Sequence, residues 1–149
     1  MPWHPQCAFW SGVATGEGVL RKGRGMASDQ SVTLAALKER VKKFVDDRDW
    51  ARYHNAKDVA VSITIEAAEL VEIFQWVKDS EQHKIFEDPA KMQKLRNELA
   101  DVLIYCVSLA NALDIDIGKA VFEKIAENEG KYPVERIKGN YRKYKDLQS

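Results

Sequence analysis

The chain has 149 residues, and its 23 lysine and arginine residues balance 23 aspartate and glutamate residues, so its formal net charge is zero. A neutral chain lacks the basic surface of a general nucleic-acid-binding protein, and no uncharged apolar run approaches the ~18 residues of a membrane span. Two cysteines are too few for a disulfide framework, so we expect a globular, cytoplasmic protein that binds neither a membrane nor a nucleic-acid polymer.

The first 27 residues differ in composition from the rest of the chain. Residues 1–25 hold five of the eight glycines and two of the four prolines, and no helical or strand period runs through them. We expect residues 1–27 to form a disordered or loosely attached extension, with a transit peptide as the less favoured alternative. Met26 directly follows the glycine-rich stretch, and our hypothesis is that translation starts there. Residues 28–149 are expected to form one helical domain.

The first predicted helix follows this extension. Apolar residues recur at helical spacing from Leu34 to Val45, with charged residues on the opposite side. Ser31 or a neighbour is expected to cap this helix. The segment DRDWARYHN (47–55) breaks the period and is predicted to be a connector.

Two longer helices come next. The second is expected to have Asn55 as its N-cap and to run to about Asp79. A solvated loop is predicted over 80–88. Asp88 followed by a proline is a strong start signal for a third helix, which is expected to end near Leu113.

A fourth helix is predicted between Asp116, as its N-cap, and Gly130, as a left-handed C-cap. The polar tail 134–149 is expected to include a short final helix. No segment shows strand alternation, so we predict an all-α fold. An antiparallel four-helix bundle would bury the apolar faces of the four segments.

Two pairs of carboxylates stand in apolar parts of the second and third helices. Glu66 and Glu69 are three residues apart and so lie on one helix face, and Glu98 and Asp101 repeat this spacing. Burying carboxylates without a cation is costly, so four of them on adjacent helices predict a bound cation. Oxygen ligands without histidine or cysteine suit Mg²⁺ or Mn²⁺, whereas a di-iron bundle would use Glu-x-x-His pairs.

The alternative for this pattern is a pair of solvated helix faces. Glu-x-x-Glu is common on exposed helices, and Lys94 or Arg96 would then neighbour Glu98 at the rim of the bundle. Glu72 lies roughly 120° around an ideal helix from Glu66, so we expect it at the periphery rather than among the first ligands.

The order of these motifs resembles that of the MazG-like nucleotide pyrophosphohydrolases, in the all-α NTP pyrophosphatase superfamily. Glu66-x-x-Glu69 followed by Glu98-x-x-Asp101 is similar to the family's paired motif, within the stretches IEAAELVEIFQW and NELADVLIYCVSLA. RDWARYHN and KIAENEGKYPVERIKG are similar to the family's aromatic connector and to the segment that closes over the nucleotide. The resemblance covers residues 32–139. It implies Mg²⁺-dependent hydrolysis of a nucleoside triphosphate to the monophosphate and pyrophosphate, with Mn²⁺ as an alternative ion.

The resemblance also implies roles for particular residues. It makes Glu66, Glu69, Glu98 and Asp101 the metal ligands, and Glu69 is the favoured residue for orienting or deprotonating the attacking water. It matches Trp50, His54 and Trp76 to aromatic positions near the nucleoside. Tyr105, one helical turn after Asp101, is expected to line the same pocket. Cations and amides suit a triphosphate, so the residues expected near the β and γ phosphates are Lys124, Asn128, Lys131 and Tyr132. For each of these eight residues, the alternative is core packing, helix capping or a solvated helix end.

The FQW signature and the aromatic connector are similar to those of the dCTP pyrophosphatase-like subgroup, which favours dCTP or a modified or non-standard pyrimidine nucleotide as substrate. Phosphoribosyl-ATP hydrolysis and a non-catalytic helical interaction module are the alternatives. The third helix is apolar on all sides, which exceeds what one interface buries. We therefore expect a homodimer or homotetramer whose site is lined by more than one chain.

Overall fold

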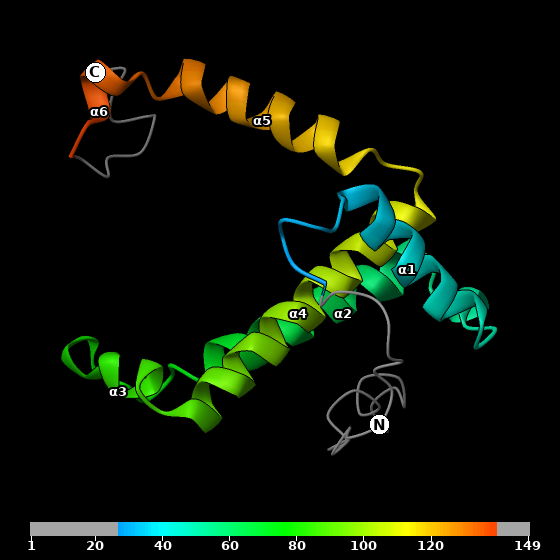
Figure 1. Cartoon of the computed structure of the whole chain (residues 1–149). Coiled ribbons are helices and arrows are strands. Elements are labelled where there is room, and N and C mark those ends of the chain that lie inside the picture. Colours follow the sequence, from blue (N-terminus) through cyan, green and yellow to red (C-terminus); the bar gives the residue numbers. More distant parts are fainter. Residues whose placement is uncertain (1–26, 140–149) are drawn as a thin grey trace. The chain divides into compact units, whose positions relative to one another are not determined.

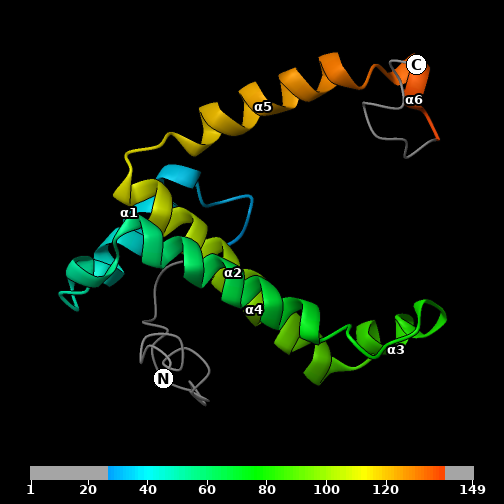
Figure 2. The same cartoon turned by 180° about the vertical axis from the view of Figure 1, so that it is seen from behind.

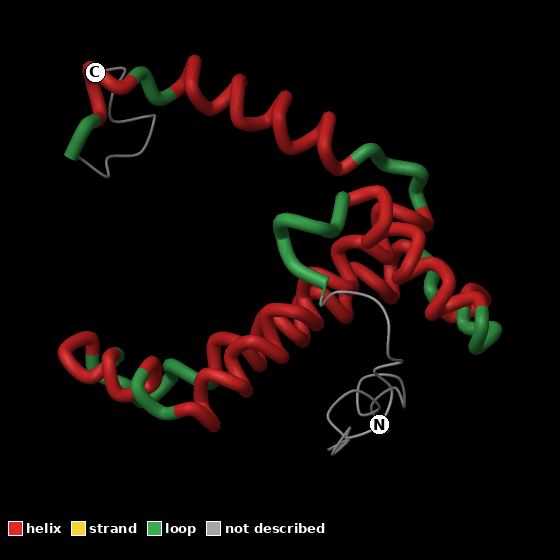
Figure 3. The backbone as a smooth tube through the Cα atoms, in the orientation of Figure 1, coloured by secondary structure: helices red, strands yellow, loops and turns green. Residues whose placement is uncertain are grey.

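The computed structural model describes residues 27–139, which form helices joined by turns, with no strand in this range (Figure 1, Figure 3). The predicted all-α class is confirmed. The predicted extension up to residue 26 and the tail from residue 140 lie outside the described residues. The chain divides into two compact units, one that ends at Leu113 and one that begins at Asp114.

α1 (Leu34–Asp46) forms where the first apolar period predicts a helix. Thr33 is its N-cap, because its hydroxyl accepts a hydrogen bond from the backbone N–H of Ala36 at 3.1 Å. After α1 the chain turns at Asp49, whose φ of 54° lies in the left-handed region that aspartate tolerates better than most residues. A short 3₁₀ helix, η2 (Ala51–Tyr53), completes the predicted connector.

α2 (Ala56–Glu72) begins as predicted. The side chain of Asn55 caps it by accepting a hydrogen bond from the backbone N–H of Asp58 at 3.0 Å. The predicted end near Asp79 is wrong, because tight turns with hydrogen bonds across three residues replace the helix after Glu72. No glycine or proline marks this end and apolar residues continue beyond it, so the period alone overestimates the length of the helix.

The predicted loop 80–88 contains helical structure. η3 (Asp79–Glu81) and α3 (His83–Phe86) precede α4 (Pro89–Ala112). Ile85 is almost fully buried, and α3 contacts α4. The prediction of a solvated loop is therefore wrong at Ile85. A single buried apolar residue in a polar segment produces no helical repeat of apolar residues, so the sequence gives no sign of its burial.

α4 starts as predicted. The side chain of Asp88 accepts hydrogen bonds from the backbone N–H groups of Ala90 at 2.9 Å and Lys91 at 3.2 Å, and Pro89 occupies the first turn. A proline is suited to this position because its missing N–H would have no partner within the helix.

α2 and α4 lie side by side and antiparallel (Figure 1, Figure 2). Glu72 at the end of α2 faces Lys94 near the start of α4. At the other end, His54 just before α2 is hydrogen-bonded to Ser108 near the end of α4. α1 packs on the same end of α4, where Asn111 donates a hydrogen bond to a backbone carbonyl of α1 at 2.9 Å. The buried apolar residues of this unit are Val41, Val45, Val59, Ile85, Tyr105, Val107 and Ala110.

The second unit contains α5 (Ile117–Lys131) and α6 (Val134–Ile137), of which α6 confirms the predicted short final helix. Asp116 caps α5 as predicted by accepting a hydrogen bond from the backbone N–H of Lys119 at 2.9 Å. Because α5 belongs to a different unit from α1, α2 and α4, the assembly of four helices into one bundle stays a prediction.

The predicted left-handed C-cap at Gly130 is wrong. α5 continues through this residue, which has no positive φ. The backbone N–H of Tyr132 still bonds to the carbonyl of Asn128 at 2.8 Å, so the helical hydrogen bonds extend past the glycine. No helix within residues 27–139 is long and apolar enough to cross a membrane.

Candidate metal centre

Three glutamates from two helices converge on one point. Glu66 and Glu69 lie on one face of α2, one turn apart, and Glu98 lies on the neighbouring α4. One carboxylate oxygen from each of the three lies within 4.8 Å of the other two. The antiparallel pairing of α2 and α4 therefore brings the two predicted motifs together.

Glu66 is the buried member of this group, with only 3% of its surface exposed. Burial, followed by the negative charges of Glu69, Asp101 and Glu98, raises the pKa of Glu66 to about 7. At neutral pH this carboxyl group is therefore near the midpoint of its titration, and a nearby positive charge would favour its ionised form.

The fourth predicted carboxylate, Asp101, belongs to the same electrostatic cluster. It lies on α4, three residues after Glu98. Burial and then the charge of Glu69 raise the pKa of Asp101, and the same two causes lead the rise in the pKa of Glu98. The charge of Glu69 thus acts on all three of the other carboxylates.

The cluster has the donor set of a hard divalent cation. Within residues 27–139, none of the four carboxylates forms an ion pair with lysine or arginine. Buried carboxylates without a counter-ion are unfavourable, and ligands that are all oxygen suit Mg²⁺ or Mn²⁺. The residues present fit such an ion, and the burial of Glu66 argues against the alternative of two solvated helix faces.

Glu72 lies at the exposed rim of the cluster, as its angle around the helix indicates. Its Oε2 is 4.0 Å from Nζ of Lys94 on α4, and both side chains are more than half exposed. Burial is the main influence on the pKa of Glu98, but Lys94 lowers that pKa whereas Glu72 raises it. Lys94 therefore gives the rim a positive charge that the interior of the cluster lacks among the described residues.

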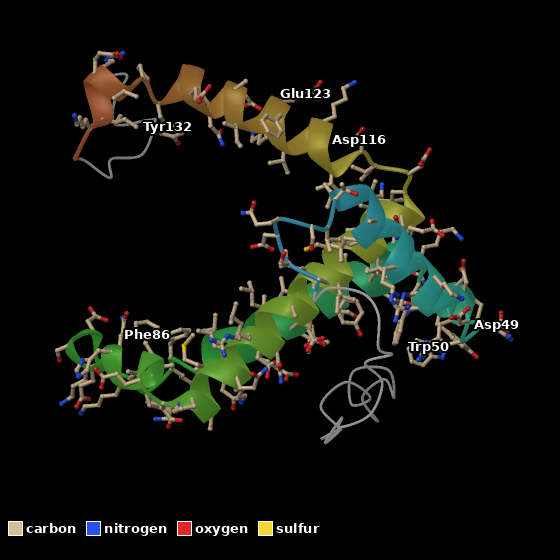
Figure 4. The ribbon with its side chains drawn as sticks, viewed as in Figure 1. Asp49, Trp50, Phe86, Asp116, Glu123 and Tyr132 are labelled. Carbon is tan, nitrogen blue, oxygen red and sulfur yellow. The ribbon has the colours of Figure 1, made fainter. Side chains whose placement is uncertain are left out.

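Three of the predicted nucleoside residues form a row of aromatic rings. The centroids of Trp50 and His54 are 6.4 Å apart with the rings inclined at 25°. The centroids of His54 and Tyr105 are also 6.4 Å apart, with an inclination of 30°. Tyr105 is buried and follows Asp101 by about one turn on α4, so the row leads from the connector towards the carboxylates. Figure 4 shows Trp50 beside the end of α1.

His54 does not cap α2, a role that Asn55 takes. Instead, Nδ1 of His54 is hydrogen-bonded to Oγ of Ser108 at 3.1 Å. Burial lowers the pKa of His54, which favours the neutral ring. The sequence reasoning missed Ser108, although its spacing of seven and three residues from Asp101 and Tyr105 places it on the same face of α4.

Trp76 does not belong to this row. It lies in the turns that follow α2, and it is 88% exposed. An indole ring so open to solvent is not packed against Trp50, His54 or Tyr105.

The four predicted phosphate residues lie on α5 and at its end: Lys124, Asn128, Lys131 and Tyr132. Figure 4 shows Tyr132 at this end. Nζ of Lys124 is 2.8 Å from Oε2 of Glu127, and Lys131 pairs with the other oxygen of the same carboxylate. These hydrogen bonds lower the pKa of Glu127 to about 2. The four residues belong to the second unit, so their approach to the carboxylate cluster stays a prediction.

Comparison with known proteins gives consistent matches. A model of the MazG-like family matches residues 61–147, a stretch that includes both carboxylate pairs. The dCTP pyrophosphatase 1 of Rattus norvegicus is 36% identical over 115 residues, which cover 77% of this chain and 68% of that protein. The dCTP pyrophosphatase 1 of Homo sapiens is 33% identical over 136 residues, which cover 91% of this chain and 79% of that protein.

A solved structure extends the likeness to the fold. A pyrophosphatase from Archaeoglobus fulgidus is 37% identical in sequence and superposes with a TM-score of 0.63, covering 74% of this chain and 99% of that chain. The family match spans more than half of the chain. The chain belongs to the MazG-like family.

Proposed function

We propose that this protein hydrolyses a nucleoside triphosphate to the nucleoside monophosphate and pyrophosphate, with Mg²⁺ as its cofactor and Mn²⁺ as a substitute. The observation that carries the proposal is the convergence of Glu66, Glu69 and Glu98 within 4.8 Å. Family membership and relatives named dCTP pyrophosphatase support it. The proposed substrate is dCTP or a modified or non-standard pyrimidine nucleotide, and the proposed role is to remove such nucleotides.

Glu66, Glu69, Glu98 and Asp101 would hold the ion. When bound, Mg²⁺ supplies a positive charge that polarises the α-phosphoryl group and lowers the pKa of a coordinated water. The carboxylates bind a cation in their ionised form, so ion binding and the loss of the proton from Glu66 are coupled. The reaction forms a bond between the water oxygen and the α-phosphorus, and breaks the bond from that phosphorus to the bridging oxygen of the departing pyrophosphate.

Glu69 is the proposed acceptor of the proton from the attacking water. Its charge acts on each of the other three carboxylates, which places it at the electrostatic centre of the cluster. A carboxylate in this position would lie beside water held by the proposed ion, which it could orient and deprotonate.

The aromatic row and α5 are proposed to hold the nucleotide. Trp50, His54 and Tyr105 would contact the nucleoside, and an indole that stacks on a base contributes about 1–3 kcal/mol. The exposed Trp76 would add a second stacking surface. Lys124, Asn128, Lys131 and Tyr132 would bind the β and γ phosphates, for which ammonium and amide donors are suited.

We also propose a homodimer or homotetramer. Leu99 and Leu103 lie one turn apart on α4 and are about half exposed, and Phe122 on α5 is 76% exposed. Large apolar side chains left open in one chain are typical of surfaces that a second chain covers. Analytical ultracentrifugation tests this, and a stable monomer with full activity would contradict it.

A substrate panel tests the reaction. The full chain is incubated with Mg²⁺ and each common ribonucleoside and deoxyribonucleoside triphosphate, together with phosphoribosyl-ATP, and the products are separated. We expect dCMP and pyrophosphate from dCTP at the highest kcat/KM. Formation of dCDP and inorganic phosphate would contradict the proposed reaction, and a preference for phosphoribosyl-ATP would contradict the proposed substrate.

Glu69→Gln tests the centre itself. It keeps the size of the side chain and removes its charge and its ability to accept a proton, so we expect kcat to fall by at least about 10²–10⁴-fold, the usual contribution of a general base. The far-ultraviolet circular dichroism should not change. Glu39→Gln is the matched control, because Glu39 is an exposed glutamate on α1, far along the chain from the cluster. If Glu69→Gln kept the rate of the control, the assignment of the centre would be wrong.

A further inference from the structure

Ser108 is a buried polar residue whose hydrogen bond leaves its own helix. It lies near the end of α4 and is 6% exposed. Serine and threonine hydroxyls inside helices often donate to the carbonyl four residues earlier. Ser62 and Thr64 do so in α2, at 3.1 Å and 3.3 Å. Ser108 instead contacts Nδ1 of His54, 54 residues away in sequence.

The direction of this hydrogen bond follows from the needs of the hydroxyl. A buried hydroxyl requires an acceptor for its proton, and within the described residues Nδ1 of His54 is the acceptor that Ser108 reaches. A neutral imidazole accepts at one nitrogen and donates at the other. If Oγ donates to Nδ1, the ring proton must be on Nε2.

The imidazole of His54 is held in place as well as oriented. Its ring lies between those of Trp50 and Tyr105, with both centroids 6.4 Å away. Its backbone N–H bonds to the carbonyl of Trp50 at 3.2 Å, which fixes the chain from which the ring projects. Nε2 has no hydrogen-bond partner among the described residues, so it is the ring atom that remains for a ligand.

We propose that Ser108 is a positioning residue of the nucleotide site, whose hydroxyl donates to Nδ1 of His54 and fixes the neutral tautomer with its proton on Nε2. The ring then presents one N–H donor, which selects a carbonyl oxygen or an unprotonated ring nitrogen of the nucleotide over an amino group. The nature of the ligand rests on the proposed function. The hydrogen bond and the tautomer do not.

Nitrogen NMR of the full chain labelled with ¹⁵N-histidine tests the tautomer directly. The chain has three histidines, and His54→Gln assigns the signals of His54 by their loss. We expect the native protein to carry the ring proton on Nε2, and Ser108→Ala to give a mixture of tautomers with unchanged circular dichroism. A native ring protonated on Nδ1, or a Ser108→Ala spectrum identical to the native one, would overturn the proposal. Neither result requires a substrate.

Steady-state kinetics tests the consequence for binding. We expect Ser108→Ala to raise KM for the preferred triphosphate by about three- to tenfold, with kcat within about twofold, as the loss of one hydrogen bond implies. Ser108→Thr should restore KM because it restores the hydroxyl. In a His54→Gln background, Ser108→Ala should have no further effect.

Ser62→Ala is the matched control, since it removes a partly buried hydroxyl that bonds only within α2. An unchanged KM in Ser108→Ala would overturn the positioning role. So would an equal rise in KM when Ser108→Ala is made in the native protein and in His54→Gln. If no triphosphate is hydrolysed, the proposed function fails, while the NMR result still decides the tautomer.

Discussion

Glu66 on α2 and Glu127 on α5 are the same side chain in opposite surroundings. Burial and neighbouring carboxylates raise the pKa of Glu66 to about 7, whereas hydrogen bonds from Lys124 and Lys131 lower the pKa of Glu127 to about 2. The charge of Glu127 is balanced within its own helix. The charge of Glu66 has no such partner among the described residues, so its carboxyl group either holds a proton or is balanced by the cation that we propose.

The two regions also differ in how they are packed. α2 and α4 enclose buried side chains between them, and Val59 on α2 is 2% exposed. α5 has no buried residue, and Val121 on its surface is 47% exposed. The α2–α4 region therefore has buried side chains, whereas the contacts described for α5 are its N-cap and the ion pairs along its own surface.

Val59 on α2 and Val121 on α5 should differ strongly in how much their packing stabilises the fold. Val59→Ala removes two methyl groups from a closed site and leaves a cavity, so it should lower the free energy of unfolding by about 2 kcal/mol. Val121→Ala removes the same atoms from an exposed position and should have little effect in an isolated chain. Urea denaturation followed by circular dichroism measures both.

The effect of Val121→Ala at different protein concentrations tests whether another chain covers α5. A loss as large as that for Val59, which disappears when the protein is diluted below the dissociation constant of its oligomer, would show that another chain covers α5. Equal losses at all dilutions would contradict the description of α5 as an exposed helix.

Helix starts were predictable because their signals are local. Asn55, Asp88 and Asp116 each accept a hydrogen bond from a backbone N–H within three residues, so a short stretch of sequence contains the whole interaction. The burial of Ile85 was not predictable in this way, because it depends on packing of α3 against α4, and the end of α2 carries no local stop signal such as glycine or proline. The pattern of apolar residues does not show where such a contact begins or stops.

In the candidate site too, the features set by local spacing were predictable, whereas a contact between distant residues was not. The spacing of Glu66 and Glu69 predicts a shared helix face, and pairing of the two predicted helices brings Glu98 to them, with one carboxylate oxygen of each within 4.8 Å of the other two. The contact between His54 and Ser108 joins residues 54 apart and depends on the register of α4 against the connector. No local pattern specifies that register, so only the folded chain reveals it.

The second prediction concerns the pH dependence of stability without a metal ion. The pKa of Glu66 is about 7 in the folded chain against an ordinary value of 4.5, so the folded state holds the proton more tightly. In EDTA, the contribution of Glu66 to the free energy of unfolding should therefore be greatest below pH 4.5. It should fall as the pH rises to about 7 and stay low above that pH. We expect the Tm to drop by about 4 °C or more between pH 5 and pH 8, and Mg²⁺ to restore it at pH 8.

Glu66→Gln isolates this contribution. The contribution of His54 to stability has the opposite pH dependence. Burial lowers the pKa of His54, so the free energy of unfolding rises as the pH increases through 6.5. The difference in Tm between native protein and Glu66→Gln removes the shared contribution of His54. If Glu66→Gln showed the same fall in Tm as the native protein, the carboxylate would not be the destabilising charge.

Glu127 on α5 should have only a small effect on KM. Glu127→Gln removes the anion that engages Lys124 and Lys131, so the positive charge of both would become available to a triphosphate. We expect KM to fall by about two- to threefold at low ionic strength and to converge on the native value at high salt, because exposed charges are screened. Glu123→Gln is the matched control, since Glu123 lies on the same helix and pairs with Lys119 at 3.8 Å. An equal fall in KM in both variants would mean that net charge alone sets the attraction, whereas a rise in KM for Glu127→Gln alone would mean that Glu127 orients the two lysines for the phosphates.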